Sequence, residues 1–337
     1  MNLNHHRFLF SVLLFTGAGL LSAQDARPDA KQLLQSAHQI SGISLPYKVQ
    51  ANVTINPGPT EKKGSIMIYR DHGRSMTDLH VQDYREIKLV LGNKLYVYRS
   101  TPYPIPQLGK LADTDHAWDK LTDDGDAKLG DVSKKKVQNH QANCFDVKGE
   151  QRHRLCFDPG KNILLESLDQ QHAFEFTDYA EQDGHLFPTK ITVLLELAQQ
   201  EKPVLLIENI EVHKTEYTDA AFAIPPHATE FDTCDNLQEA KPLKTPAPDF
   251  SESEIRKNGA VSPIVNIYGI VNKDGTLENI KVLSSDTELQ QTILEALKKW
   301  RYTPAMCGST AVSSEREFPV SLFGDMGDTV PQGRRGR

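Results

Sequence analysis

Alternation of apolar and polar residues marks much of the first two thirds of the chain. Tyr47, Val49, Ala51, Val53 and Ile55 occupy every second position, which predicts a strand that is buried on one face. Further strands are predicted at residues 65–70, 87–91, 95–99, 191–197 and 204–212. Because little helix separates these strands, they predict one large antiparallel sheet whose concave face needs a cover.

A first helix is predicted at residues 29–39, because the proline of Arg27-Pro28-Asp29 suits the entrance to a helix. Its apolar side chains lie on one side and belong to Leu33, Leu34, Ala37 and Ile40. The helix and the strands together predict an α+β fold. In this fold, residues 27–226 form a curved antiparallel sheet or half-barrel with helices.

The last part of the chain predicts a small ββαβ unit. Residues 264–271 are rich in Ile, Val and Tyr, and the Asp274-Gly275 pair that follows is a strong hairpin signal. After a second strand, Ser285 and Glu288 fit a capping box at the start of a helix. That helix continues to Trp300, and a last strand is predicted at residues 313–323.

Residues 248–324 resemble the C-terminal domain of the TonB family, the energy transducers that reach outer-membrane receptors. The resemblance rests on the run Trp300-Arg301-Tyr302-Thr303-Pro304-Ala305 after an amphipathic helix, and on the stretch from Phe318 to Phe323. Two residues depart from the family pattern. Pro263 stands where a glycine is usual, and Glu254 stands where a small residue is usual. The signature positions that the resemblance assigns to the domain core are Gly275, Trp300, Tyr302 and Pro304.

This resemblance implies an open sheet edge that accepts an extended segment of an outer-membrane receptor or another envelope protein. The last strand is the expected edge, because Pro319 cannot donate a hydrogen bond to a neighbouring strand. The charges on this strand are expected to set the charge preference for a partner, or alternatively to protect the edge against aggregation. The expected partner-binding residues are Ser314, Glu315, Arg316, Glu317, Phe318 and Val320.

Residues 27–226 are loosely similar to the periplasmic lipoprotein carriers of the LolA and LolB type. The similarity rests on the order of elements, with the run from Gly64 to Arg70, the run from Phe187 to Ile191, and Pro225-Pro226 at the end. It implies an apolar cavity for a lipid, a lipoprotein or another apolar ligand. The alternative is that these aliphatic residues fill a core and leave no cavity.

The start of the chain indicates a targeting segment. His5, His6 and Arg7 precede an apolar run of fourteen residues, 8–21, whereas a membrane-spanning helix needs about 20. We therefore predict a signal peptide at residues 1–23 and a periplasmic location; the alternative is an uncleaved inner-membrane anchor that faces the periplasm. The remaining segments are a Pro-containing linker at 227–247 and a disordered tail at 325–337.

Four cysteines in an exported chain favour disulfides. Cys144 and Cys156 flank a predicted hairpin and lie opposite each other, at a separation that a disulfide bridges. A zinc site with neighbouring histidines is the alternative, but strand alternation places His153 on the other face from Cys156. For Cys234 and Cys307 we hypothesise a second bond, which joins the linker to the C-terminal domain.

Charge and motifs limit the functional classes. The net charge of −7 argues against a nucleic-acid partner, because such a surface needs a concentrated basic patch. The sequence contains no HExxH, GxSxG, phosphate-loop or dinucleotide-binding motif. We therefore expect a protein that is not an enzyme and that holds no cofactor and no metal.

Overall fold

The computed structural model describes most of the chain between residues 29 and 321. The described residues are 29–42, 45–105, 128–148, 153–168, 172–197, 200–234, 237–246, 248–249, 264–283 and 287–321. The predicted signal peptide at 1–23 and the predicted tail at 325–337 lie outside these residues. Among the described helices, none is long and apolar enough to span a bilayer.

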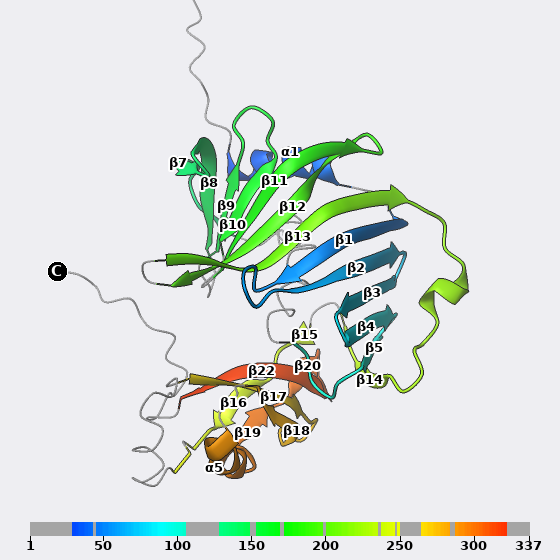
Figure 1. Ribbon diagram of the computed structural model, residues 1–337, viewed down its shortest axis with the longest axis vertical. Helices are drawn as coiled ribbons and strands as arrows, with labels where there is room; N and C mark the ends of the chain where they lie inside the picture. Colours follow the sequence, from blue (N-terminus) through cyan, green and yellow to red (C-terminus); the bar gives the residue numbers. More distant parts are fainter. Residues whose placement is uncertain are drawn as a thin grey trace, which may run out of the picture.

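A large antiparallel sheet of 14 strands forms the N-terminal part (Figure 1). Its order is β14-β5-β4-β3-β2-β1-β13-β12-β11-β10-β9-β8-β6, and β7 pairs with β8. The α+β prediction of one large curved sheet is therefore confirmed. The strands are β1 Tyr47–Ile55, β2 Lys62–Asp71, β3 Arg74–Val81, β4 Tyr84–Leu91, β5 Lys94–Arg99, β6 Lys128–Leu129, β7 Ser133–Val137, β8 His140–Lys148, β9 His153–Phe157, β10 Leu164–Leu168, β11 His172–Gln182, β12 His185–Leu197, β13 Gln200–Lys214 and β14 Thr229–Asp232.

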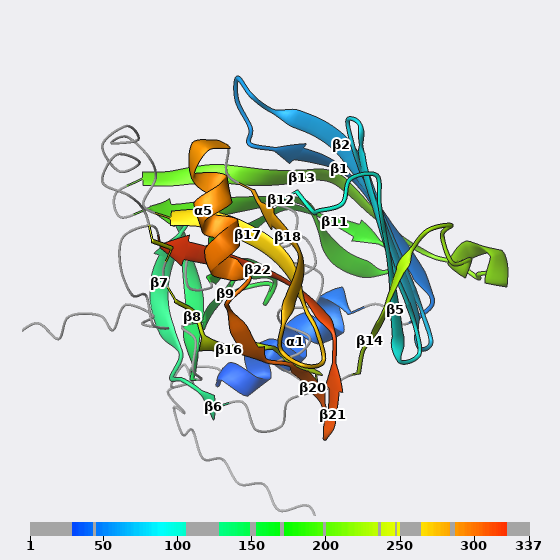
Figure 2. The ribbon, with the colours of Figure 1, turned by 90° about the horizontal axis from the view of Figure 1, so that it is seen from below.

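Helix α1 (Ala30–Ser41) covers part of the inner side of this curved sheet (Figure 2). A capping box starts the helix, because the side chain of Asp29 accepts from the backbone N–H of Gln32 and the Gln32 side chain accepts in return. The buried face of α1, with Leu33 and Leu34, packs into one continuous apolar cluster with the strands. The apolar stripe read from the sequence is thus the face that holds α1 on the sheet.

The C-terminal unit lies below the large sheet and is built around a three-stranded sheet with the order β18-β17-β22 (Figure 1). Its core contains Trp300, Tyr302 and Phe318, whose ring centroids are 5.5 to 6.3 Å apart. The predicted ββαβ order is confirmed. The elements are β17 Ile264–Val271, β18 Leu277–Val282, α5 Thr287–Leu297, β19 Arg301–Thr303, β20 Ala305–Cys307, β21 Thr310–Val312 and β22 Ser314–Ser321.

The signature residues of the C-terminal unit meet at one packing point. Gly275 has a φ of +80° and accepts a hydrogen bond of 2.9 Å from the Tyr302 backbone N–H. A Cβ at this position would collide with the Tyr302 carbonyl oxygen. The indole N–H of Trp300 donates to the carbonyl oxygen of Pro246 at 2.8 Å, and Pro304 separates β19 from β20.

The segment predicted as an extended linker, 227–247, contains three short strands. In addition to β14, these are β15 (Leu237–Gln238) and β16 (Lys241–Lys244). Strand β14 pairs with β5 of the large sheet, whereas β15 pairs with β20 and β16 with β19 of the C-terminal unit. The prolines alone favour extended backbone, and the structure shows that this backbone completes strand edges on both sides.

Both predicted cysteine pairs are disulfides. Cys144 and Cys156 face each other on β8 and β9, with their Cα atoms 4.1 Å apart, so these two sulfurs are not available to zinc. Cys234 and Cys307 join the end of β14 to β20, with Cα atoms 5.9 Å apart. The second bond therefore holds the C-terminal unit close to the large sheet.

We expect Gly275→Ala to destabilise the C-terminal unit by about 2–3 kcal/mol more than Gly308→Ala. Gly308 is the matched control, because it also has a positive φ, +61°, but a Cβ there meets no atom within 4 Å. Denaturant unfolding followed by tryptophan fluorescence, with the disulfides intact, measures both variants. Equal losses of stability would show that close packing on Tyr302 does not matter.

Candidate functional site

Strand β22 lies at one edge of its sheet. In the described part of the chain it pairs with β17 alone, from Ile264 opposite Ser321 to Val271 opposite Ser314, without a register shift. In such a ladder, alternate residues direct their N–H and C=O away from the neighbouring strand. Pro319 has no N–H and therefore fits the outward-directed set. Glu317, two residues earlier, shares this parity, so its N–H points to the open side.

Side chains of β22 divide between the two sheet faces, which separates the charges that the sequence grouped together. Phe318 packs into the core of the C-terminal unit. The Arg316 guanidinium lies 5.7 Å from the centroid of the Tyr302 ring and donates to the Ala240 carbonyl oxygen. Glu315, of opposite parity, turns toward the large sheet. Of the remaining predicted residues, Ser314 is half-buried, and the side chain of Val320 lies outside the described set.

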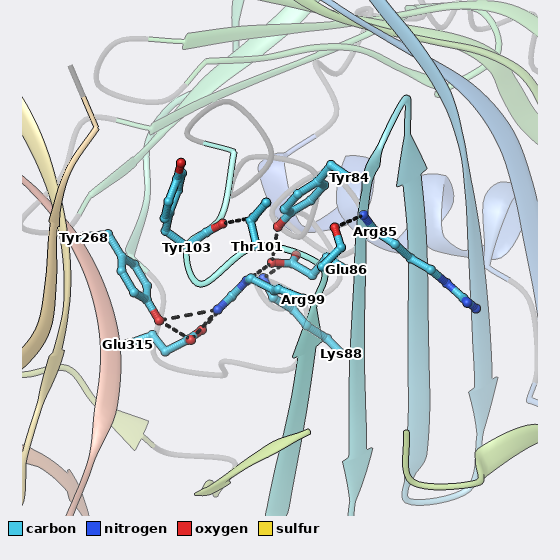
Figure 3. Close-up of polar contacts among 10 residues, drawn as sticks. Tyr84, Arg85, Glu86, Lys88, Arg99, Thr101, Tyr103, Tyr268 and Glu315 are labelled. Carbon is cyan, nitrogen blue, oxygen red and sulfur yellow. Dashed lines mark hydrogen bonds and ion pairs between the residues drawn. The ribbon is translucent and has the colours of Figure 1, made fainter. Parts of the chain in front are cut away.

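Arg99, at the end of β5, joins the two parts of the protein (Figure 3). Its Nη1 and Nη2 atoms donate to the two carboxylate oxygens of Glu315 at 2.5 and 2.8 Å. Its Nε atom donates to Glu86 on β4. The Tyr268 hydroxyl of β17 donates to Glu315 at 2.6 Å. The Arg99 side chain is 8% exposed, so one buried guanidinium serves a carboxylate from each part.

The charges in this group stabilise one another. Burial alone would lower the pKa of Arg99, but the hydrogen bonds and charges of Glu315 and Glu86 outweigh it and raise that pKa. Burial alone would raise the pKa of Glu86, but Lys88 and Arg99 lower it overall. The Tyr84 hydroxyl also donates to Glu86 at 2.9 Å. Both partners therefore remain ionised in the folded protein.

An apolar contact lies beside the ion pairs. Val97 of β5 and Phe231 of β14 pack against Tyr268 and Ile270 of β17. Beside them, Asp232 accepts from Lys94 of β5 at 2.7 Å and from Lys273 of the C-terminal unit at 3.0 Å. A cavity of about 420 Å³ opens at this junction, and its lining residues are Val97, Arg99, Thr101, Pro102, Tyr103, Thr229, Tyr268, Ile270, Asn279, Ile280, Lys281 and Glu315.

Sequence reasoning located β22 and Glu315 but missed Arg99, Glu86 and Tyr268. Arg99 stands at the end of a strand, where a charged residue is ordinarily exposed, and nothing in the sequence signals its burial. Among the described residues, no group of three or more His, Cys, Asp or Glu side chains is placed to hold a metal ion. The arrangement has the features of a contact surface built on a strand edge.

Residues 254–321 match the protein family described as Gram-negative bacterial TonB protein C-terminal. The match covers β17 to β22 and leaves out the large sheet. The C-terminal unit is therefore a TonB-type domain, as the Trp300 motif predicted. A search of curated proteins gave no significant match.

Three solved structures show a low similarity to this chain, each with a TM-score below 0.5. A LolA superfamily protein from Nitrosomonas europaea is 12% identical, with 58% of this chain and 98% of that chain covered and a TM-score of 0.42. A DUF1329 family protein from Desulfovibrio piger is 13% identical, with coverage of 57% and 95% and a TM-score of 0.41. A putative outer membrane lipoprotein-sorting protein domain from Vibrio parahaemolyticus is 8% identical, with coverage of 57% and 95% and a TM-score of 0.40.

Glu317→Gln should change how the stability of the protein depends on pH. Partial desolvation by neighbouring protein atoms, followed by the nearby carboxylates of Glu86 and Glu315, raises the pKa of Glu317 to about 7 from 4.5, although the residue is exposed and Lys88 and Arg99 act in the opposite direction. The folded state therefore holds a proton that the unfolded chain has lost, and this contribution to stability disappears as pH rises from 4.5 to about 7.

We expect the wild type to lose about 1 kcal/mol more than Glu317→Gln between pH 4.5 and 7.5, since solvent reaches this side chain and screens the effect. Urea unfolding at a series of pH values measures the difference. Glu278→Gln on β18 is the control, because it removes an exposed carboxylate from the same sheet. Parallel pH profiles of the wild type and Glu317→Gln would contradict the assignment.

Proposed function

We propose that this protein is a non-enzymatic component of the cell envelope that binds an extended partner segment by β-strand addition to β22. The observation that carries the proposal is the position of β22 at the edge of a TonB-type domain, with β17 as its pairing partner in the described chain. The expected partner is an outer-membrane receptor or another envelope protein. We place the mature protein in the periplasm, after removal of residues 1–23.

Strand addition uses main-chain groups for affinity and alternate side chains for selectivity. The outward-directed backbone of β22 supplies the main-chain groups. Neighbouring strands place side chains of matching parity on the same face of a sheet. One set of partner side chains would therefore lie near Phe318, and the other near Glu315 and Glu317. The second set favours a partner with a basic or neutral residue on that face.

The short connection between the large sheet and the C-terminal unit argues against a protein that extends across the periplasm. Strands β14, β15 and β16 tie the connecting segment to both sides, and the Cys234–Cys307 bond shortens it further. A transducer that crosses the periplasm needs a much longer Pro-rich spacer. We therefore propose that the partner segment is delivered to this protein within the periplasm.

Glu317→Pro tests the proposal against Glu317→Gln. Both variants remove the carboxylate, but the proline also removes the outward N–H, and it leaves the hydrogen bonds to β17 in place because of its parity. We expect Glu317→Pro to weaken peptide binding about 3–10-fold relative to Glu317→Gln, the size of one main-chain hydrogen bond.

The probes are short synthetic peptides that tile the periplasm-facing segments of outer-membrane receptors from the same organism. Calorimetry gives the affinity, and backbone amide exchange of residues 314–321 locates the contact. Equal binding by the two variants, or peptide protection confined to other strands, would exclude strand addition at β22.

The alternative function is a periplasmic carrier of a lipid, a lipoprotein or another apolar ligand in the N-terminal part. It is favoured by partly buried apolar side chains at the margin of the large core, including Val49, Val147, Phe187 and Val204. The dense cluster around α1 favours a filled core instead. Native mass spectrometry of protein purified from its own periplasm separates the two, since a carrier retains acyl-bearing molecules.

A further inference from the structure

Glu315 is part of the proposed binding strand and also part of the contact with the large sheet. It lies on the strand proposed to bind a partner, and both of its carboxylate oxygens are held by Arg99 of the large sheet. Figure 3 shows Glu315 and Tyr268 turned toward Arg99, across the junction from β22 and β17. A partner strand next to β22 would bring its own side chains to this same face, where Arg99, Glu86 and Lys88 already lie.

We propose that the N-terminal part controls access to β22 through the contact between Arg99 and Glu315. With the contact formed, the side chains that a partner strand brings to this face meet Arg99, Glu86 and Lys88. With the contact broken, this face beside the edge is free to take them. This inference rests on the proposed function of β22 and assigns the regulation of that site to the large sheet.

The hydrogen-bond pattern makes the contact reversible. When Glu315 leaves, Arg99 keeps Glu86 as its partner inside the large sheet, so no buried charge is left alone. Glu315, whose side chain is already 19% exposed, returns to water. A buried ion pair contributes little net stability when each ion has another favourable environment. The free energy that holds the contact is therefore small enough for a partner to offset.

A second ion pair across the junction has the same design. Asp232 binds Lys273 of the C-terminal unit and also Lys94 of β5. If the junction opens, Asp232 keeps Lys94. When either of these two ion pairs breaks, the charged group on the large sheet, Arg99 or Asp232, still has an oppositely charged neighbour.

Opening of this contact is local, because the two parts stay connected. The Cys234–Cys307 bond joins the end of β14 to β20, and β14 remains in the ladder with β5. The apolar group of Val97, Phe231, Tyr268 and Ile270 also remains packed behind the ion pairs. The geometry therefore permits release of the Glu315 side chain from Arg99 without separation of the domains.

Two variants test the proposal from opposite sides. Glu315→Gln removes the charge on β22, and Arg99→Lys keeps a cation beside Glu86 but loses the planar fork that binds two carboxylates. Residue 99 lies outside β22 but on the face that partner side chains would reach. A gain in peptide affinity with Arg99→Lys therefore reports release of Glu315 only when amide exchange at residues 314–318 is also faster in the free protein, where no peptide is present.

We expect Arg99→Lys to bind the receptor-derived peptides about 3–10-fold more tightly than the wild type, because a larger fraction of molecules has an accessible edge. Glu315→Gln breaks the same contact but also changes the binding strand, so amide exchange in the free protein is its readout. We also expect faster amide exchange at residues 314–318 in the free variants. Glu278→Gln is the matched control and should change neither quantity.

Unchanged peptide affinity and unchanged amide exchange in both variants would overturn the proposal that Arg99 regulates access to β22. The comparison of Glu317→Pro with Glu317→Gln still decides separately whether β22 binds a peptide. If no peptide binds the wild type or any variant, strand addition is wrong. Amide exchange at residues 314–318 then tests the Arg99 contact on its own, and no acceleration overturns it.

Discussion

Unpaired strand edges are the constraint around which this protein is organised. An edge strand presents a row of unsatisfied N–H and C=O groups, and a stable protein has to pair, cover or use them. Strand β14 extends the ladder at β5, and β15 and β16 do the same at β20 and β19. The connecting segment therefore acts as three short edge strands. On β22, the described chain pairs one side only, with β17.

Arg99 decides how the two sheets meet. A guanidinium with five donors in a fixed plane serves two carboxylates that lie in different directions. Glu86 keeps the Arg99 guanidinium ionised in a buried position. The hydrogen bonds to Glu315 orient this guanidinium toward the C-terminal unit. Apolar packing of Val97 against Ile270 supplies the non-directional part of the contact. The ion pairs set the orientation, and the apolar group holds the surfaces together.

Much of the fold followed from local patterns. Strand alternation predicted the large sheet, the apolar stripe predicted α1, and the Trp300 motif predicted the TonB-type domain. Opposed strand positions predicted the Cys144–Cys156 bond. These predictions were successful because hydrophobic periodicity, turn residues and hairpin register depend on residues that are close together in the chain. The strand pairing of the linker could not be predicted, because proline content indicates a preference for extended backbone and says nothing about which strand edges lie nearby.

By itself, the sequence determined the two kinds of sheet, the edge character of β22 through Pro319, and the cysteine pair of one hairpin. Tertiary structure alone decided that Arg99 is buried, that Glu315 meets Arg99 while Arg316 lies against Tyr302, and that β14 belongs to the large sheet. The physical reason is distance along the chain. Arg99 and Glu315 are separated by 216 residues, and no local pattern records which distant charge will share a buried site.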